Sequence, residues 1–367
     1  MKTGIITMHF PENYGAVLQA YALQQYTSRF CEVEIINYIH NPKYSRKSNS
    51  ILTLFRKIRA TGGKIKRIGR DIPGYIERKK RAEKFSVFQR EYFKLSQNTY
   101  HGDREIFAAP PRYDFYISGS DQIWNTNITN NSAAYYLGFV NSGKKYSYAS
   151  SFGHRNLTDK EYEFSQKYLS LYADITVRES MSARQLSEWL GRPVEVMTDP
   201  VFLLSKAEWT GMVKRVECLK DRDFIFVYNM QYNQAMIRTV KAVEKYGLAI
   251  IVVNGGGTKI HYNARELKDC GPQEFLWLIL NAKYVVTNSF HGAAFSLIFG
   301  KNVWICEHTV RNLRLEELLS WGKSEDKQIR EDSTWTNIDE KMVDGQKVYD
   351  MIDVEKGRHY IQEILGR

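Results

Sequence analysis

The sequence predicts an α/β protein built from two Rossmann-like domains that face each other across a cleft. Short β-branched and aromatic runs alternate with segments of helical periodicity, which is the element order of a parallel α/β sheet. This plan occurs twice, and 367 residues suit two domains of about 150 to 200 residues each. We expect a first domain over 1–205, a second over 206–345, and a C-terminal helix in 346–367 that could cross back to the first domain.

The chain opens with a strand, a loop and a helix, followed by a second strand. The strands are expected at 2–7 and 32–38, with a turn-rich loop at 8–15 and a helix with apolar residues at helical spacing at 16–26. Gly15 at the helix entry would let a ligand approach the backbone closely. Because the loop has no GxGxxG pattern, a dinucleotide site has no support.

The positive charge of the chain is concentrated in one segment. The net charge is +11, and residues 43–81 hold 14 Lys and Arg against two acidic residues. We place this segment in an excursion from the first domain at about 43–105. Its stretches 51–58 and 65–68 mix apolar and basic residues, as an amphipathic helix on an anionic membrane does. A solvated helical excursion is the alternative, and no nucleic-acid motif accompanies the charge.

Two later strands of the first domain end in polar residues that could bind a ligand. A strand from residue 113 runs into a Gly/Ser/Asp loop with Asp121 and Gln122 beside Trp124, which could hold a sugar or its base, or could be a capped turn. Arg178 falls at another strand end, where a guanidinium can grip a phosphate or carboxylate. The elements expected around it are strand 144–151, helix 157–171, strand and loop 173–180, helix 182–190 and strand 194–202.

The second half of the chain repeats the same alternation. Its expected elements are strand 224–228, helix 233–246, strand 248–253, helix 272–280, strand 284–287, a helix from 292 to 300, strand 302–305, helix 311–321 and helix 353–365. We expect the strand at 302–305 to close the second sheet.

The strand at 284–287 passes directly into a helix through Asn288, Ser289 and His291. Ligands collect at the carboxyl ends of parallel strands, and helix N-terminal amides attract anions. A histidine there can exchange a proton near neutral pH. The plainer interpretation is that Ser289 is an N-cap and His291 a packed, hydrogen-bonded side chain.

Composition excludes several other classes of protein. Cys31, Cys218, Cys270 and Cys306 show no CxxC or Cys/His spacing, which indicates reduced thiols and argues against a zinc site. No run approaches the roughly 20 apolar residues of a spanning helix, and no signal peptide is visible. We therefore expect a cytoplasmic protein that needs no metal or cofactor.

Six stretches together resemble the polysaccharide pyruvyl transferase family. They are GIITMHFPENYGAVLQAYALQQY, ISGSDQIWN, KKYSYASSFG, ITVRESMSARQL, VMTDPVFLL and VVTNSFHGAAFSLIFG. Their order and spacing cover most of residues 1–320, without the basic excursion or the tail. The resemblance implies a GT-B-like fold and phosphoenolpyruvate as donor. It also implies that the acceptor is a sugar of a cell-surface glycan, often lipid-linked, which receives pyruvate as a cyclic ketal.

The resemblance also suggests roles for individual residues. Arg178 matches the arginine of the family's VRE-like motif, and His291 matches its histidine, our choice of general acid. Many members have an arginine two residues before this histidine, where this chain has Ser289. The residues expected at the donor are Arg178, Ser289, His291, Gly292, Arg311 and Arg314. Those expected at the acceptor are Asn13, Tyr14, Gly15, Asp121, Gln122 and Trp124.

Two questions stay open on the sequence alone. The base for the sugar hydroxyls is Asp121, Glu179 or Asp199, with Asp121 grouped with His291 and Arg178 as catalytic. The alternatives in function are a GT-B nucleotide-sugar glycosyltransferase and a non-catalytic member that binds glycan or membrane. In every case an anionic surface at the inner face of the membrane is a candidate partner of residues 43–81, and nucleic acid is not.

Overall fold

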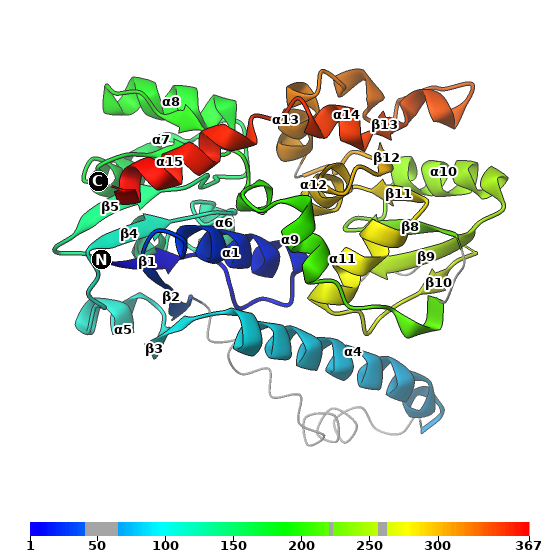
Figure 1. The fold of residues 1–367 in the computed structure, drawn as a ribbon, viewed down its shortest axis with the longest axis horizontal. Helices are drawn as coiled ribbons and strands as arrows, with labels where there is room; N and C mark the ends of the chain where they lie inside the picture. Colours follow the sequence, from blue (N-terminus) through cyan, green and yellow to red (C-terminus); the bar gives the residue numbers. More distant parts are fainter. Residues whose placement is uncertain (41–64, 220–222, 256–262, 311, 367) are drawn as a thin grey trace.

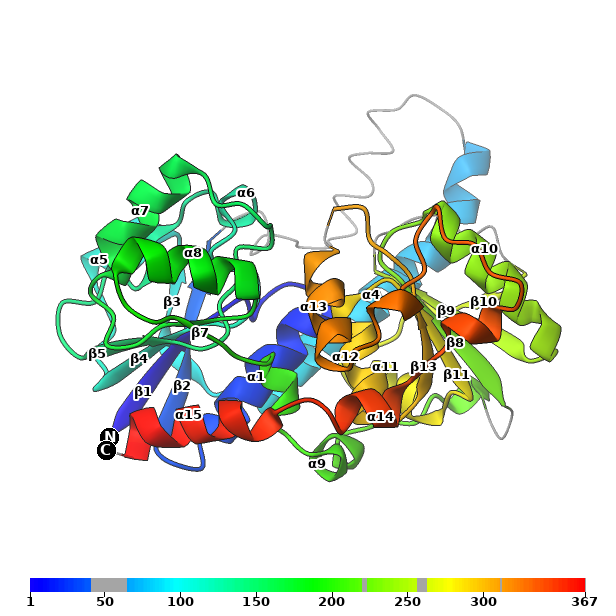
Figure 2. The same ribbon diagram turned by 90° about the horizontal axis from the view of Figure 1, so that it is seen from above.

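The computed structural model describes residues 1–40, 65–219, 223–255, 263–310 and 312–366. Two α/β domains lie side by side, and Figures 1 and 2 show them from two directions. Within the described residues no helix combines the length and the apolar character needed to cross a lipid bilayer.

The first domain is built on a parallel sheet. Its strands are β1 (Lys2–Ile6), β2 (Glu32–Ile39), β3 (Leu95–His101), β4 (Phe115–Ser118) and β5 (Lys144–Ser147), in the order β3-β2-β1-β4-β5. The short pair β6 (Thr176–Val177) and β7 (Glu195–Val196) continues this sheet through parallel bridges from Tyr146 to Asp174 and from Ser150 to Val177. All described residues of β4 are buried, as expected for a strand covered on both faces.

Helices cover both faces of this sheet. They are α1 (Tyr14–Thr27), α4 (Ile65–Tyr92), α5 (Asp103–Ala108), α6 (Thr126–Thr129), α7 (Asp159–Leu169) and α8 (Ser180–Leu190). Asn13 is the N-cap of α1, and its side chain accepts a hydrogen bond from the Ala16 amide at 3.2 Å. Thr158 and Glu161 form a capping box at the start of α7. The starts of α1 and α7 are therefore fixed by local side chains.

The second domain repeats the arrangement with one antiparallel strand added. Its strands are β8 (Phe224–Asn229), β9 (Ala249–Asn254), β10 (Arg265–Glu266), β11 (Tyr284–Thr287), β12 (Asn302–Ile305) and β13 (Val343–Asp344), in the order β10-β9-β8-β11-β12-β13. Its helices, with the connecting and C-terminal ones, are α9 (Lys206–Gly211), α10 (Gln234–Val243), α11 (Pro272–Asn281), α12 (Phe290–Ile298), α13 (Leu313–Trp321), α14 (Gly345–Tyr349) and α15 (Val354–Gly366). The expectation that β12 closes the sheet is wrong, because β13 pairs antiparallel with its outer side.

The predicted basic excursion is shorter than expected. Residues 95–101 form β3, the edge strand of the first sheet, so the excursion does not reach residue 105. Helix α4 is part of the folded body: Phe85 and Phe88 are buried, and Lys84 donates to both carboxylate oxygens of Glu274 at 2.7 Å. Figures 1 and 2 show α4 running beside both domains. The expected stretch 51–58 lies outside the described residues.

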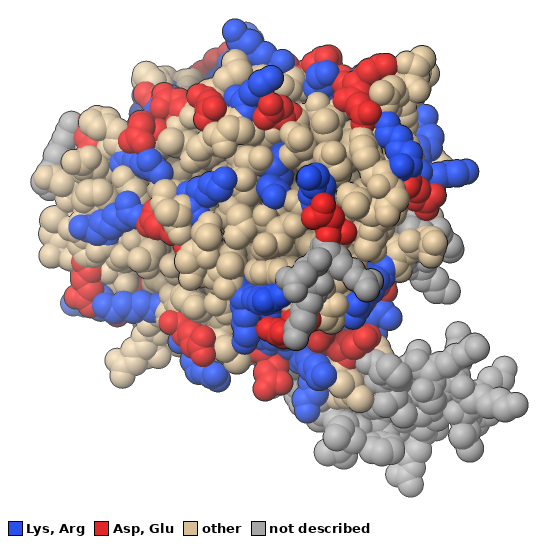
Figure 3. Space-filling view, turned by 45° about the vertical axis from the view of Figure 1, so that its right-hand side comes forward, with Lys and Arg blue, Asp and Glu red and all other residues tan. Residues whose placement is uncertain are grey.

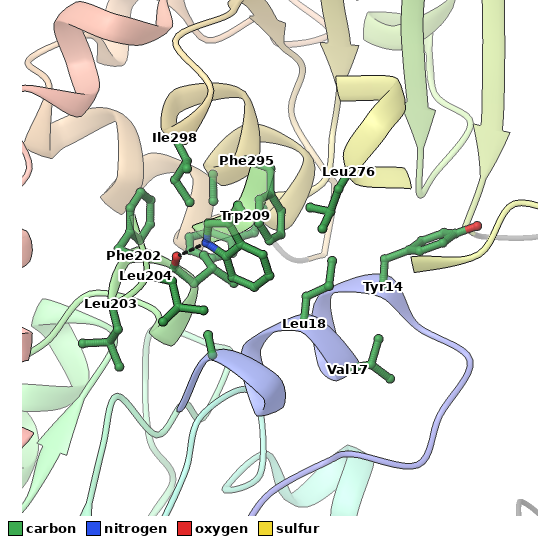
Figure 4. Close-up of a cluster of buried hydrophobic side chains, with 14 of the residues drawn as sticks. Tyr14, Val17, Leu18, Phe202, Leu203, Leu204, Trp209, Leu276, Phe295 and Ile298 are labelled. Atoms are coloured by element: carbon green, nitrogen blue, oxygen red, sulfur yellow. Dashed lines mark hydrogen bonds between the residues drawn. The ribbon is translucent and has the colours of Figure 1, made fainter. Parts of the chain in front are cut away.

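The two domains share an apolar core, which Figure 4 shows in close-up. The ring of Trp209 from α9 meets Phe295 of α12 edge-to-face at 4.9 Å, and its Nε1 donates to the Val201 carbonyl at 2.9 Å. Tyr14 of α1 stacks on Phe275 of α11 at 4.5 Å. We call these four ring residues, Tyr14, Trp209, Phe275 and Phe295, the apolar interface.

The last helix, α15, lies against the first domain (Figures 1 and 2). The Tyr360 hydroxyl donates to the Ser147 carbonyl at 3.1 Å, and the Tyr360 ring packs against Tyr148. Arg358 donates through Nε to the Leu203 carbonyl at 3.0 Å. The chain therefore passes from the first domain to the second and back again.

Candidate active site between the two domains

A pocket of about 270 Å³ lies between the carboxyl ends of the two sheets, where ligands bind in open α/β sheets. The first domain lines it with residues that follow β1, β2 and β4: Met8, Phe10, Pro11, Asn13, Ala16, His40, Asp121, Gln122 and Ile128. The second domain lines it with Tyr228 near the end of β8 and with residues that follow β8, β11 and β12: Met230, Asn288, Ser289, Phe290, His291, His308 and Arg314. Its volume lies just below the ~300–1,000 Å³ range of pockets for drug-sized ligands.

His291 lines this pocket at the start of α12. Ser289 is the N-cap, and its Oγ accepts a hydrogen bond from the Gly292 amide at 3.4 Å. His291 is 7% exposed, and its Nε2 lies 3.4 Å from Asp199 Oδ2. On the other side the ring lies against Gly15, where a Cβ atom would come within 2.0 Å of Nδ1. The imidazole is therefore fixed between the two domains.

Arg178 reaches the same carboxylate from the first domain but does not line the pocket. Its Nη2 lies 2.9 Å from Asp199 Oδ2 and donates to Ser120 Oγ at 2.5 Å. The side chain is 1% exposed, and its Cζ lies 5.2 Å from the centroid of the Phe290 ring. The expectation that Arg178 grips a donor anion directly is therefore corrected: in this structure its partner is a buried carboxylate behind the pocket wall.

Asp121 and Arg314 form a second ion pair across the domain boundary, and both line the pocket. Arg314 Nη1 lies 3.1 Å from Asp121 Oδ1, and Arg178 Nη1 lies 3.9 Å from the same oxygen. Burial raises the pKa of Asp121, but the charges of Arg314 and Arg178 more than offset this, so the pKa lies below its ordinary value. Asp121 is therefore ionised at neutral pH.

Asp199 is the buried centre of the group. It is 0% exposed, and its Oδ1 accepts a hydrogen bond from the Val201 amide at 3.0 Å. Burial opposes its ionisation, but Arg178 and His291 lower its pKa to about 2. We call Asp121, Arg178, Asp199, His291 and Arg314 the ionic cluster.

Glu179 differs from both aspartates. Burial raises the pKa of its carboxyl above the ordinary value, and Arg178 offsets this only in part. It accepts a hydrogen bond from the Ser151 hydroxyl and does not line the pocket. Of the three carboxylates considered as base, only Asp121 borders the space where a substrate would lie.

Two residues expected at the acceptor belong instead to the core. Tyr14 is 0% exposed, and its hydroxyl donates to the Cys270 carbonyl at 2.8 Å. Trp124 is also 0% exposed, donates to the Tyr135 carbonyl at 3.2 Å and stacks on Tyr136. Both assignments are corrected, because each ring is fully buried and its polar atom already donates to a carbonyl of the protein.

The other expected residues occupy varied positions. Asn13 and Gln122 line the pocket, whereas Gly15 is covered by the His291 ring. Gly292 packs under Thr287, whose Oγ1 lies 2.5 Å from the position of an added Cβ, so it contributes to the helix start and not to the pocket wall. Arg311 lies outside the described residues.

Sequence reasoning missed Phe10, His40 and His308 as lining residues. The signal that singled out Arg178, a residue just after a predicted strand, applies equally to His40 after β2. Within the described residues, no group of three or more His, Cys, Asp or Glu side chains could hold a metal ion.

Comparisons with solved structures support the fold class. The UDP-GlcNAc 2-epimerase of Methanocaldococcus jannaschii, solved with UDP-GlcNAc and UDP, superposes with a TM-score of 0.50 at 11% identity and full coverage of both chains. A structure from Listeria monocytogenes, assigned as a UDP-N-acetylglucosamine 2-epimerase, superposes with a TM-score of 0.50 at 10% identity. The superposition covers 98% of this chain and 90% of the Listeria chain. The predicted GT-B-like fold of two Rossmann-like domains is confirmed.

Sequence comparisons address the family. No curated protein matches the chain significantly. The model of the polysaccharide pyruvyl transferase family, however, matches residues 13–309, which include the pocket-lining residues from Asn13 to His308. This range is most of the chain and extends over both domains. The protein is therefore a transferase of the polysaccharide pyruvyl transferase family.

Proposed function

We propose that the protein transfers pyruvate from phosphoenolpyruvate, as a cyclic ketal, onto a sugar of a capsular or exopolysaccharide or of its lipid-linked precursor. The observation that carries this proposal is the convergence of His291, Asp121 and Arg314 on one small pocket in a member of this family. A proton donor, a carboxylate and a fixed cation are the three groups that the reaction needs.

The donor carries a phosphate and a carboxylate, so its site must supply positive charge. Arg314 lines the pocket, and the first turn of α12 presents its N-terminal amides beside Ser289. Because serine stands where many members have an arginine, Arg314 is our choice for the main cation. An entering phosphate competes with Asp121 for this guanidinium, since the two side chains lie 3.1 Å apart.

The reaction begins with a proton transfer. His291 gives its proton to the methylene carbon of phosphoenolpyruvate, which leaves an oxocarbenium-like centre at C2. A sugar hydroxyl adds to C2 and loses its proton, the C–O bond to phosphate breaks, and a second hydroxyl adds to close the ketal and releases the second proton. Asp199, held ionised behind the ring, stabilises the imidazolium before the transfer.

Asp121 is our choice of base because it borders the pocket, unlike Asp199 and Glu179. Its lowered pKa makes it a weak base. A weak base suffices here, because a hydroxyl that attacks an oxocarbenium-like carbon becomes strongly acidic as the new bond forms.

The proposal includes a cytoplasmic enzyme at the inner face of the membrane, where a lipid-linked acceptor would be presented. Arg81 is not available for lipid, because it donates to the carbonyls of Glu12 and Asn254 across the domain boundary. On the described part of the face in Figure 3, Lys and Arg are interspersed with Asp and Glu. Membrane contact would use the other basic residues of 43–81, of which Arg78, Lys79 and Lys80 on α4 are exposed. Deleting residues 43–64 and replacing these three residues by Gln should abolish binding to anionic vesicles and leave turnover of a soluble acceptor intact.

Phosphate release tests the chemistry. The full chain, incubated with phosphoenolpyruvate and candidate sugars, should release phosphate, and His291→Ala should slow this by roughly 10²- to 10⁴-fold, the usual contribution of a general acid. Full activity of that variant would show that the acid lies elsewhere. Binding of a nucleoside diphosphate sugar with none of phosphoenolpyruvate would identify a glycosyltransferase, and binding of glycan without any turnover a non-catalytic member.

A further inference from the structure

We propose that the ring of Phe10, with His40 set edge-to-face beside it, forms the platform on which one pyranose ring of the acceptor stacks. The inference rests on the proposed function, whose acceptor is a sugar, and it assigns that sugar a place in the pocket. Both side chains line the pocket, both are half-buried, and neither belongs to the ionic cluster.

Sheet topology separates this pair from the charged groups. His40 follows β2 and Asp121 follows β4, and these two strands flank β1 on opposite sides. Adjacent strands are about 4.8 Å apart, so the two strand ends are separated by roughly 10 Å. Phe10 lies in the loop after β1, and its ring meets the His40 ring edge-to-face with the ring centroids 5.4 Å apart. The pocket therefore has a charged side over β4 and an aromatic side over β1 and β2.

The aromatic side is rigidly held. His40 Nδ1 and the Tyr135 hydroxyl are hydrogen bonded at 3.1 Å, and the two rings also pack edge-to-face with their centroids 5.7 Å apart. Tyr135 in turn packs edge-to-face on Tyr38 at 5.2 Å. Phe10 also packs against His9, with ring centroids 5.7 Å apart. A platform fixed in this way loses little side-chain freedom when a ligand binds.

The chemistry of this side suits an uncharged sugar better than the donor. Burial lowers the pKa of His40, so the ring is neutral at neutral pH and does not attract a phosphate. Two rings with Ile128 and Met8 nearby offer apolar area to the C–H face of a pyranose. Asn13 uses its carboxamide oxygen to cap α1, which leaves the NH₂ group of this lining residue for a sugar hydroxyl.

This placement orients the reaction. A sugar on the β2 side presents its hydroxyls toward a donor held on the β4 side, with His291 and Arg314 supplied by the second domain. Because the pocket of about 270 Å³ is smaller than the pockets that hold drug-sized ligands, we place one sugar unit inside it and the rest of the glycan outside.

Steady-state kinetics on the full chain provide the first test. Phe10→Leu, which keeps apolar volume but removes the ring, should raise KM for the sugar acceptor by about 2- to 12-fold, since aromatic contacts contribute about 0.5–1.5 kcal/mol beyond their area. Phe10→Tyr, which keeps the ring, should have the acceptor KM of the wild type. KM for phosphoenolpyruvate should stay unchanged in Phe10→Leu and in Phe10→Tyr. Phe107→Leu is the matched control, because this exposed phenylalanine of α5 lies outside the pocket lining.

Direct binding separates this inference from the proposed function. Saturation-transfer NMR with methyl glycosides and no phosphoenolpyruvate should show contact with the ring face of the sugar in the wild type, and this signal should weaken in Phe10→Leu. An unchanged signal and an unchanged acceptor KM in Phe10→Leu would overturn the subsite, as would a nucleoside monophosphate that binds there in place of glycosides. If phosphoenolpyruvate does not bind the wild type while glycosides do, the subsite stands and the proposed donor is wrong.

Discussion

The apolar interface and the ionic cluster both join the two domains, but they do so by different physics. The apolar interface packs large rings such as Trp209 and Phe295, whose contribution grows with buried area and needs no ligand. The ionic cluster buries charged groups such as Arg178 and Asp199, whose desolvation cancels much of their attraction. We infer that the apolar interface fixes how the two domains pack against each other. The ionic cluster instead holds charged side chains in place for catalysis.

The largest expected effect comes from removing the centre of the ionic cluster. Asp199→Asn removes the nearest counter-charge of the buried Arg178 and leaves only Asp121 at 3.9 Å, which should lower the free energy of unfolding by about 3–5 kcal/mol. It should also slow phosphate release, because His291 loses the carboxylate that holds its ring. Urea unfolding and steady-state kinetics would measure the two losses.

A double variant sharpens this prediction. Arg178→Met with Asp199→Leu replaces both buried charges by apolar groups, so most of the lost stability should return while activity stays low. Recovery of activity together with stability would show that Asp199 has only a structural role and is not a positioning residue.

The apolar interface should respond in the opposite way. Trp209→Ala should cost about 3–5 kcal/mol of stability through the cavity that it leaves, with kcat of the folded protein little changed. Trp189→Ala on α8 is the control, because Trp189 is only partly buried and packs within the first domain. A loss of kcat larger than the loss of stability in Trp209→Ala would mean that the two regions are not separable.

Gly15 tests the point where the two regions meet. A methyl group there would come within 2.0 Å of His291 Nδ1, so Gly15→Ala should displace the ring. A misplacement of about 1 Å can cost roughly 10²-fold in rate, and we expect a loss of that order in kcat. Gly211→Ala, where nothing lies within 4 Å of the added atom, should leave kcat unchanged. Equal kcat values in the two variants would contradict the contact.

The smallest effect is a pH dependence of stability. The folded-state pKa of Asp199 is about 2, below an unfolded value near 3.9, so its contribution is complete above about pH 4 and is lost as the pH falls toward 2. The expected size is about 2–3 kcal/mol. Urea midpoints between pH 5 and pH 2.5 should show this decline in the wild type and a shallower one in Asp199→Asn.

The sequence was sufficient for the fold and only partly sufficient for the site. Strand runs and helical periodicity located most elements, and the strand-end rule led to Asp121 and His291, which line one pocket. Periodicity does not show which side chain faces which partner, so it could not place Arg178 behind the pocket wall with Asp199. Tyr14 and Trp124 were misjudged for the same reason, because a ring beside a polar loop can turn toward either the ligand or the core.

Contacts between segments far apart in the sequence were the other feature that hydrophobic periodicity could not predict. The basic residues before position 81 suggested a separate excursion, yet α4 lies against both domains through Lys84 and Phe88. Such contacts depend on where the second domain lies, which no local run of residues encodes.

The return of α15 to the first domain has a consequence for how the protein is made. The first domain packs against Arg358 and Tyr360, which are translated after the whole second domain. Because domains form during synthesis from the N-terminus onward, the first one emerges from the ribosome without its final helix. We therefore expect a nascent chain stalled before residue 354 to carry a protease-sensitive first domain, and the released chain to become resistant when the last segment docks.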